Sequence, residues 1–188
     1  MWWRELSPHW RRAARLVAVL VVAGLTAGCF EPLYGSKPAV NAEGVQDKFA
    51  SVEIPPISAP KGTPTERIAV GMFNALQFDL HNGGKGAPPV YRLVVEVSGA
   101  PFTAVVNPSS GRPDAQIEVV TASFQLIEIA TGKQVLNGST SSHVDYDIPG
   151  SQQRFAAQRA RRDAEDHAVT IAAEAIRNRL ASYFVAGT

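Results

Sequence analysis

The chain has 188 residues, with 18 lysines and arginines, 17 aspartates and glutamates, and a single cysteine. This length suits one domain with a modest hydrophobic core. The charge balance lacks the basic excess expected of a nucleic-acid-binding protein, and one cysteine excludes an intramolecular disulfide.

The first 28 residues predict a secretory signal peptide. Arg4, Arg11, Arg12 and Arg15 precede an apolar run over residues 16–25, and small residues follow it. This order of basic, apolar and small residues is typical of a cleaved signal. The apolar run is about 10 residues long, too short for a helix that crosses about 30 Å of hydrocarbon, so a permanent transmembrane anchor is the less favoured alternative.

The signal ends in Leu-Thr-Ala-Gly-Cys at residues 25–29, which resembles the bacterial lipobox. We therefore predict that Cys29 carries a diacylglycerol and an N-acyl chain, and we expect no other cofactor. The alternative is a chance cysteine at the start of a secreted domain. Cleavage removes four of the 18 basic and one of the 17 acidic side chains, which leaves 14 against 16 and a net charge of −2.

Residues 29–48 contain prolines and glycines without sustained periodicity, which predicts a lipid tether and connecting segment. Residues 49–188 are then the periplasmic domain. Its first element is a predicted strand over residues 49–57, where Val52 and Ile54 alternate with polar residues and Pro55-Pro56 ends the pairing.

A first helix follows, with a clear start and stop. Thr63, Pro64 and Glu66 fit the N-cap, first and third positions of a capping box. The predicted core stripe is Ala69, Phe73, Leu76 and Leu80, flanked by Ile68 and Met72. Asn82-Gly83-Gly84 predicts the end of the helix.

Three strands are predicted next, over residues 90–97, 116–129 and 134–146, with a loop over residues 107–113. In the second of these strands the apolar residues change face at Val119-Val120, which predicts a bulge or a strong twist. The last predicted element is a long helix over residues 152–184, with the pairs Arg159/Asp163, Arg161/Glu165 and Arg162/Asp166 on its exposed side.

The predicted order is β-α-β-β-β-α. Such an order predicts an α+β two-layer sandwich, in which two helices cover one face of a four-stranded sheet. The other face would be solvated or available to a partner.

No catalytic or metal-binding constellation stands out, so we predict that the protein is not an enzyme and binds no metal. His81, His143 and His167 have no spacing of a metal motif, and no phosphate- or dinucleotide-binding glycine pattern is present. Asp145 and Asp147 are more typical of turn acids. A cleft that brought these two together with His143 would favour the enzyme alternative.

Arg159, Arg161 and Arg162 form the most basic feature of an otherwise slightly acidic domain. The simpler interpretation is a solvated helix face. The alternative is a contact for a phosphorylated glycolipid or for an acidic partner surface.

The residues after the lipobox read Cys29-Phe30-Glu31-Pro32-Leu33-Tyr34-Gly35. This segment resembles the mature start of the LPS-assembly lipoprotein LptE family, whose members often read C-G-F-x-P-L-Y. The predicted element order and the long last helix also resemble that family over the mature chain. The glycine that usually follows the cysteine is missing here.

The resemblance implies a lipid-anchored protein in the periplasmic leaflet of the outer membrane. Its implied partners are an LptD-like β-barrel, which such a protein plugs and helps to assemble, and lipopolysaccharide. Lys85, Arg92, Arg112 and Lys133 lie in regions comparable to the basic lipopolysaccharide contacts of the family. The alternative function is an accessory lipoprotein of a lipid-transport ABC system or of a cell-wall synthase.

The lipobox gives a direct prediction. Cys29→Ser removes the thiol that is acylated, so the variant is expected to accumulate as an uncleaved precursor without incorporated palmitate. Gel mobility and radiolabelled palmitate check this, with the wild-type chain as control. A variant that was still processed and labelled would contradict the prediction.

Overall fold

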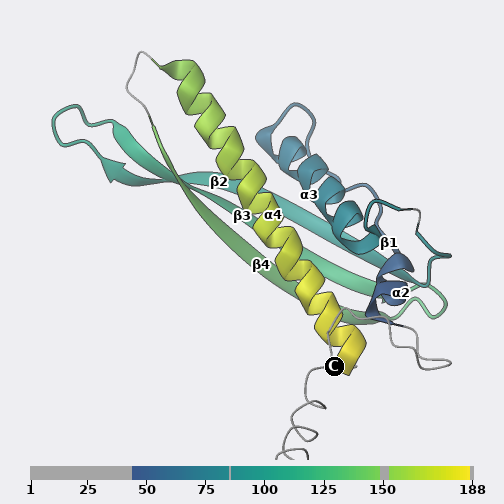
Figure 1. Ribbon diagram of the computed structural model, residues 1–188. Helices are drawn as coiled ribbons and strands as arrows, with labels where there is room; N and C mark the ends of the chain where they lie inside the picture. The colour runs from purple at the N-terminus through teal and green to yellow at the C-terminus, as the bar shows by residue number, and fades with distance from the viewer. Residues whose placement is uncertain (1–43, 85, 149–152, 187–188) are drawn as a thin grey trace, which may run out of the picture. The chain divides into compact units, whose positions relative to one another are not determined.

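The computed structural model describes residues 44–84, 86–148 and 153–186. The predicted signal peptide, Cys29, most of the predicted tether and Lys85 lie outside the described residues. Seven elements follow one another in the described part (Figure 1): α2 (Val45–Ala50), β1 (Val52–Glu53), α3 (Pro64–His81), β2 (Tyr91–Val106), β3 (Pro113–Glu128), β4 (Gln134–Asp147) and α4 (Arg154–Ala186).

The four strands form one mixed sheet in the order β1-β2-β3-β4. Strand β1 is parallel to β2, and the three long strands are antiparallel to their neighbours. Helices α3 and α4 lie side by side on one face of this sheet (Figure 1). This arrangement confirms the predicted α+β two-layer sandwich.

The first predicted strand is mostly wrong. Residues 45–50 form α2, which begins within the predicted tether, and only Val52 and Glu53 pair with β2. The side chain of Asp47 accepts a hydrogen bond from the backbone N–H of Gly44 at 3.0 Å and so caps the short helix. Phe49, which was expected in a strand, is fully buried from the helix instead.

The start and the end of α3 confirm the prediction. Thr63 Oγ1 accepts from the N–H of Glu66 at 3.3 Å, while the Glu66 carboxylate reaches back to the N–H of Gly62 at 2.6 Å. The Glu66 carboxylate therefore accepts from the N–H of Gly62, one residue before Thr63, which the capping box predicts as the donor. Asn82 adopts the left-handed conformation, with φ of 50°, and closes the helix.

Of the bulge or strong twist predicted at Val119-Val120, the bulge is wrong. Pairing continues without a break through Gly99 with Val120 and Ala100 with Val119, and the register shifts of the sheet lie elsewhere. The apolar pattern changes phase because Glu118, and not an apolar side chain, occupies the inward position before Val120 and is fully buried. Strand β2 is also longer than predicted, since its pairing with β3 continues past Gly99, where the Ile68 side chain occupies the space that a Cβ atom would need.

Helix α4 lies close to β3 and β4 through small side chains. Its buried residues include Ala164, Ala168, Ala172, Ala173 and Ala181. The hydroxyl of Ser142 on β4 donates to the backbone carbonyl of Ala168 at 2.7 Å, which ties the helix directly to the sheet. None of the helices in the described residues is long and apolar enough to cross a membrane.

An aromatic cluster holds the two ends of the described chain together. The ring of Phe184 lies 5.8 Å from that of Phe49 and 5.4 Å from that of Tyr91. Lys48 donates to the backbone carbonyl of Phe184 at 3.3 Å. Helix α2 is thereby fixed against the last turns of α4.

Gly138 of β4 leaves the space that the ring of Phe124 occupies. A Cβ atom at this position would lie 2.9 Å from Phe124 Cζ. Gly138→Val is therefore expected to reduce the free energy of unfolding by about 1–3 kcal/mol through overpacking. Chemical denaturation measures this, and Ser139→Val on the exposed face is the matched control, expected within about 0.5 kcal/mol of wild type. Equal stability of the two variants would contradict the prediction.

Candidate functional site

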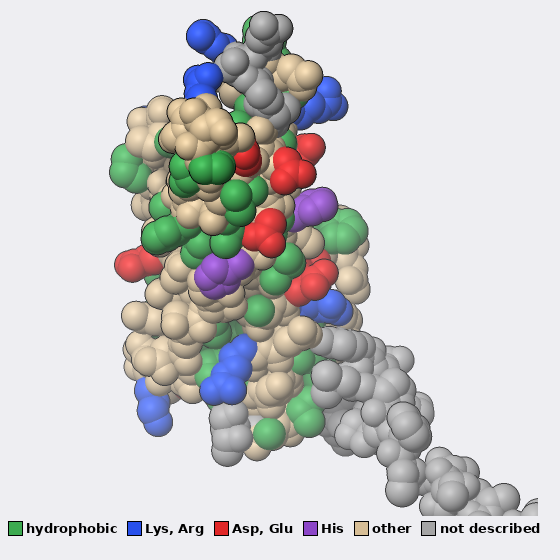
Figure 2. All heavy atoms as spheres, turned by 90° about the vertical axis from the view of Figure 1, so that its left-hand side faces the viewer, with side chains coloured by type: hydrophobic (Ala, Val, Ile, Leu, Met, Phe, Trp, Pro, Cys, Tyr) green, Lys and Arg blue, Asp and Glu red, His purple; other side chains and the backbone are tan. Residues whose placement is uncertain are grey.

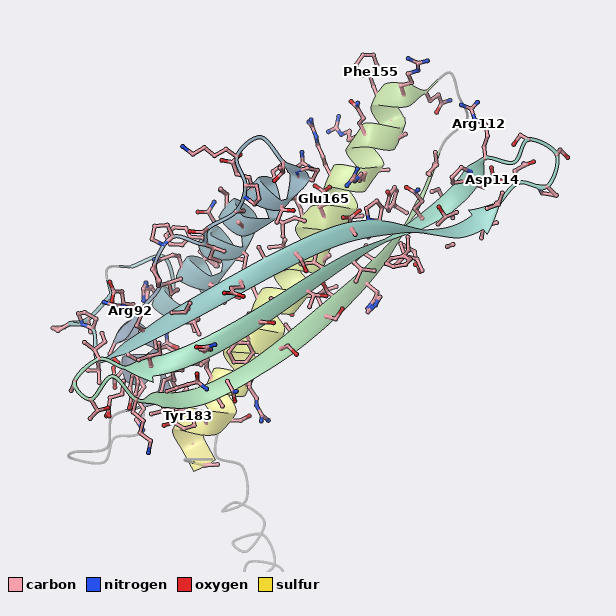
Figure 3. The ribbon with its side chains drawn as sticks, turned by 180° about the vertical axis from the view of Figure 1, so that it is seen from behind. Arg92, Arg112, Asp114, Phe155, Glu165 and Tyr183 are labelled. Atoms are coloured by element: carbon pink, nitrogen blue, oxygen red, sulfur yellow. The ribbon has the colours of Figure 1, made fainter. Side chains whose placement is uncertain are left out.

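The sheet face away from the helices is open and polar. Figure 3 shows this face in front of α3 and α4, without a described element over it. Side chains with hydroxyl, amide or carboxylate groups point outward from its centre: Glu96, Ser98, Thr121, Ser123, Gln125, Asn137, Ser139 and Ser141. Thr121 Oγ1 and Ser141 Oγ are 3.3 Å apart and hydrogen-bond across β3 and β4. The face therefore offers donors and acceptors to a polar surface.

A shallow hollow of about 380 Å³ lies in this face. Its lining consists of Val94, Glu96, Ser123, Phe124, Gln125, Asn137, Gly138 and Ser139. Short side chains on β3 and β4 leave this space open. The lining has one carboxylate and no cation, which suits neutral polar groups better than a phosphate.

Two of the residues assigned to lipopolysaccharide by the family resemblance lie far apart in the structure. Arg92 and Arg112 lie at opposite ends of the sheet (Figure 3). Arg92 Nε is bonded to the Glu53 carboxylate at 3.0 Å, and Lys133 follows the turn between β3 and β4. Arg112 lies in the loop between β2 and β3, and Lys85 is outside the described residues.

Apolar side chains are exposed at the Arg112 end. Phe102, Val105 and Val106 of β2 are more than half exposed, and Phe155 in the first turn of α4 is 89% exposed. Figure 3 places Phe155 at the same end as Arg112. The strand predicted from the sequence ended at residue 97, so Phe102, Val105 and Val106 were not expected at this end.

The arginine cluster of α4 divides between interior and surface. Arg161 Nε lies 3.1 Å from Glu165 Oε1, which confirms that pair. Glu165 is only 2% exposed and Arg161 is partly buried, so the predicted exposed location is wrong for the acid of this pair. Arg159 and Arg162 are exposed, and in the described part of the chain neither forms an ion pair with the acid predicted for it.

Arg161 belongs to a buried charge cluster that joins α3, β3 and α4. Its Nε lies 3.5 Å from Glu118 Oε2, and Arg67 of α3 bonds Glu165 through Nε at 3.0 Å. Burial raises the pKa of Glu118, the positive charge of Arg161 opposes this, and the negative charge of Glu165 adds to it. Two buried carboxylates thus share arginines whose side chains are partly exposed.

Tyr146 of β4 lies beside this cluster. Its hydroxyl donates to Gln116 Oε1 at 2.6 Å. Burial raises the pKa of Tyr146, and the negative charge of Glu118 raises it further. The phenol therefore acts as a neutral hydrogen-bond donor. The signal that could have located this cluster was the phase change in β3, because a glutamate at an inward position requires a partner.

His81 lies apart from His143 and the paired aspartates. His81 bonds the carbonyl of Val52 and the side chain of Gln77, at 3.0 and 2.8 Å, and so links α3 to β1. His143, Asp145 and Asp147 are exposed along β4. Within residues 44–84, 86–148 and 153–186, no three histidine, cysteine or acidic side chains are placed to hold a metal ion.

The fold belongs to the class of two-layer α+β domains with one uncovered sheet face. No protein-family model and no curated protein matches the chain. Among solved structures, a candidate lipoprotein from Caulobacter crescentus matches with a TM-score of 0.56 and 23% identity, over 76% of this chain and 96% of that one.

Two further solved structures share the fold. Rare lipoprotein B from Shewanella oneidensis matches with a TM-score of 0.51 and 18% identity, over 71% of this chain and 96% of that one. An uncharacterized lipoprotein B from Nitrosomonas europaea matches with a TM-score of 0.50 and 14% identity, over 72% and 84%. The chain therefore has a fold found in bacterial lipoproteins.

The buried cluster predicts a pH dependence of stability. The folded-state pKa of Glu118 lies above its ordinary value of 4.5, so its favourable contribution is complete below about pH 4.5 and is lost as pH rises through the raised pKa. The side chain of the Glu118→Gln variant does not ionise, so the variant does not lose this contribution as pH rises. The stability of the variant relative to wild type is therefore expected to increase as pH rises above 4.5, measured by denaturation across pH. A difference independent of pH would contradict the prediction.

Proposed function

We propose that the chain is a lipid-anchored outer-membrane subunit of a lipopolysaccharide translocon. In this role it plugs an LptD-like β-barrel, assists the assembly of the barrel, and contacts lipopolysaccharide during insertion at the cell surface. The sequence from Cys29 to Gly35 supports the membership in the LptE family on which this proposal depends. The fold shared with rare lipoprotein B agrees with it.

The observation that carries the proposal is the uncovered polar face of the sheet. A domain enclosed in a barrel lies against a hydrated wall, since the interior of such barrels is polar. Hydroxyl and amide groups at Ser123, Gln125 and Ser139 bond water or polar side chains equally well, so this face fits a wet lumen. The exposed apolar residues at this end would meet the acyl chains of lipopolysaccharide, and Arg112 would meet its phosphates.

The test is a pull-down of the tagged, processed protein from its native membranes in mild detergent, followed by mass spectrometry. The expected result is a large outer-membrane β-barrel in near-equal amount. Depletion of the protein is expected to lower the level of that barrel and of surface lipopolysaccharide. Recovery of an inner-membrane transporter or a cell-wall synthase instead would support the accessory-lipoprotein alternative and contradict the translocon.

A surface variant tests the role of the open face. Ser123→Trp places a bulky side chain at the centre of this exposed face without touching the core. Recovery of the barrel is expected to fall at least about tenfold, the equivalent of about 1.4 kcal/mol of binding free energy. Val70→Trp is the control. Val70 on α3 is 55% exposed, so recovery of the barrel is expected to stay unchanged. Equal loss or equal retention in both variants would argue against contact through the sheet.

A further inference from the structure

Strand β4 forms one edge of the sheet. It is last in the strand order and pairs only with β3 among the described residues. Figures 1 and 3 show no described segment beside it on the side away from β3. Its 14 residues give a long row of backbone groups at this edge.

The register shows which backbone groups are free. In an antiparallel pair, alternate residues direct both their N–H and their C=O toward the neighbouring strand. The N–H of Ile148 donates to the carbonyl of Asp114 at 2.8 Å, in step with the pairing of Asp147 with Ala115. Even-numbered residues of β4 therefore bond to β3. Odd-numbered residues, from Asn137 to Asp147, direct their N–H and C=O groups outward.

From Leu136 onward, beyond the register shift beside Gln134, this edge lacks the features with which sheets block further pairing. Proteins protect edge strands with prolines, bulges, lysines or short strands. Strand β2 has Pro101 and register shifts near Val105. Between Gln134 and Asp147 there is no proline, lysine or arginine. In Figure 2, which views the domain from the side where Figure 1 shows β4, backbone and uncharged polar side chains cover much of the surface.

An exposed apolar flank of α4 runs beside the edge. The carbonyl of Ala168 is bonded to Ser142 of β4, and Ile171 lies one turn further along the helix. Ile171 is 49% exposed, and Val144 of β4 is only partly buried on the same sheet face. An added strand would cover both residues with its inward side chains, as a fifth strand does in a larger sheet.

The position of α4 favours a single strand over a second copy of the chain. Neighbouring strands lie about 4.8 Å apart, whereas packed helices require about 8–10 Å between their axes. Because α4 packs over β4 and β3, a second copy paired at this edge would bring its own α4 within about one to two strand spacings, at or below the separation that packed helices need. An extended segment without a helix avoids this crowding.

We propose that the free edge of β4 accepts an extended strand from a partner protein, which continues the sheet by main-chain hydrogen bonds. The segment would alternate apolar side chains, which cover Ile171 and Val144, with small polar ones beside Ser139 and Ser141. A basic residue would lie beside Asp145 and Asp147, the exposed acids at the far end of β4. This binding mode is independent of the identity of the partner and of the proposed function.

Amide hydrogen exchange tests the proposal on the wild-type chain. The probe is the outward N–H groups of Asn137, Ser139, Ser141 and His143, compared between the protein in its native membranes and the same protein purified and stripped of its co-purifying partners. In native membranes these amides are expected to exchange at least about tenfold more slowly, because the added strand protects them. Equal exchange in both samples overturns the proposal.

A pair of variants separates the backbone contact from the side chain. Ser141→Pro removes an outward N–H that the fold does not use, whereas Ser141→Ala removes only the hydroxyl. The proline variant is expected to lose the exchange protection and at least about tenfold of the co-purified partner, and the alanine variant to keep both. Ser139→Pro serves as the second position if Ser141→Pro fails to fold, and the exchange comparison decides if neither proline variant folds.

The outcomes distinguish this proposal from the translocon. A folded proline variant that retains the barrel and the protection as fully as Ser141→Ala overturns the strand addition and leaves the translocon intact. Protection of β4 together with recovery of a partner that is not a barrel supports strand addition and contradicts the translocon.

Discussion

The close approach of α4 to the sheet is the constraint on which the other features depend. Alanines at the contact let the helix backbone come near enough for Ser142 to bond the carbonyl of Ala168 at 2.7 Å. The same helix holds α3 through Glu165 and Arg67, and holds α2 through Phe184. One helix thus fixes all the elements of its layer, and the opposite sheet face needs no cover to keep the domain folded.

The buried charges set the position of α4 along β3. Arg161 has to lie within reach of both Glu118 and Glu165, and a shift of the helix by one turn, about 5.4 Å, would leave the Glu118 carboxylate without a cation. An apolar contact of alanines alone tolerates such sliding. The small side chains of α4 allow close packing but do not fix where the helix lies along β3. The charge cluster fixes that position.

Local patterns predicted most of the fold. The Thr63 cap, the Asn82 stop and the alternation of β3 are short-range signals, and their physical causes lie within a few residues of each other. The burial of Glu118 and the helix at Phe49 depend on partners far along the chain, such as Arg161 and Phe184. Sequence spacing does not reveal those contacts. Of the basic residues assigned by family resemblance, Arg92 and Arg112 lie at opposite ends of the sheet, since the resemblance located regions and not distances.

The Phe49–Phe184 contact also restricts when the domain can fold. Synthesis delivers the chain from its N-terminus, so Phe49 emerges long before the residue that covers it. The core at this end stays open until almost the whole domain has been made, and loop closure over such a separation is slow compared with local pairing. The β2–β3 and β3–β4 hairpins join neighbours in the chain, so they can pair before α4 packs. Until α4 packs, the inner sheet face, with Leu93 and Leu126, is exposed apolar surface.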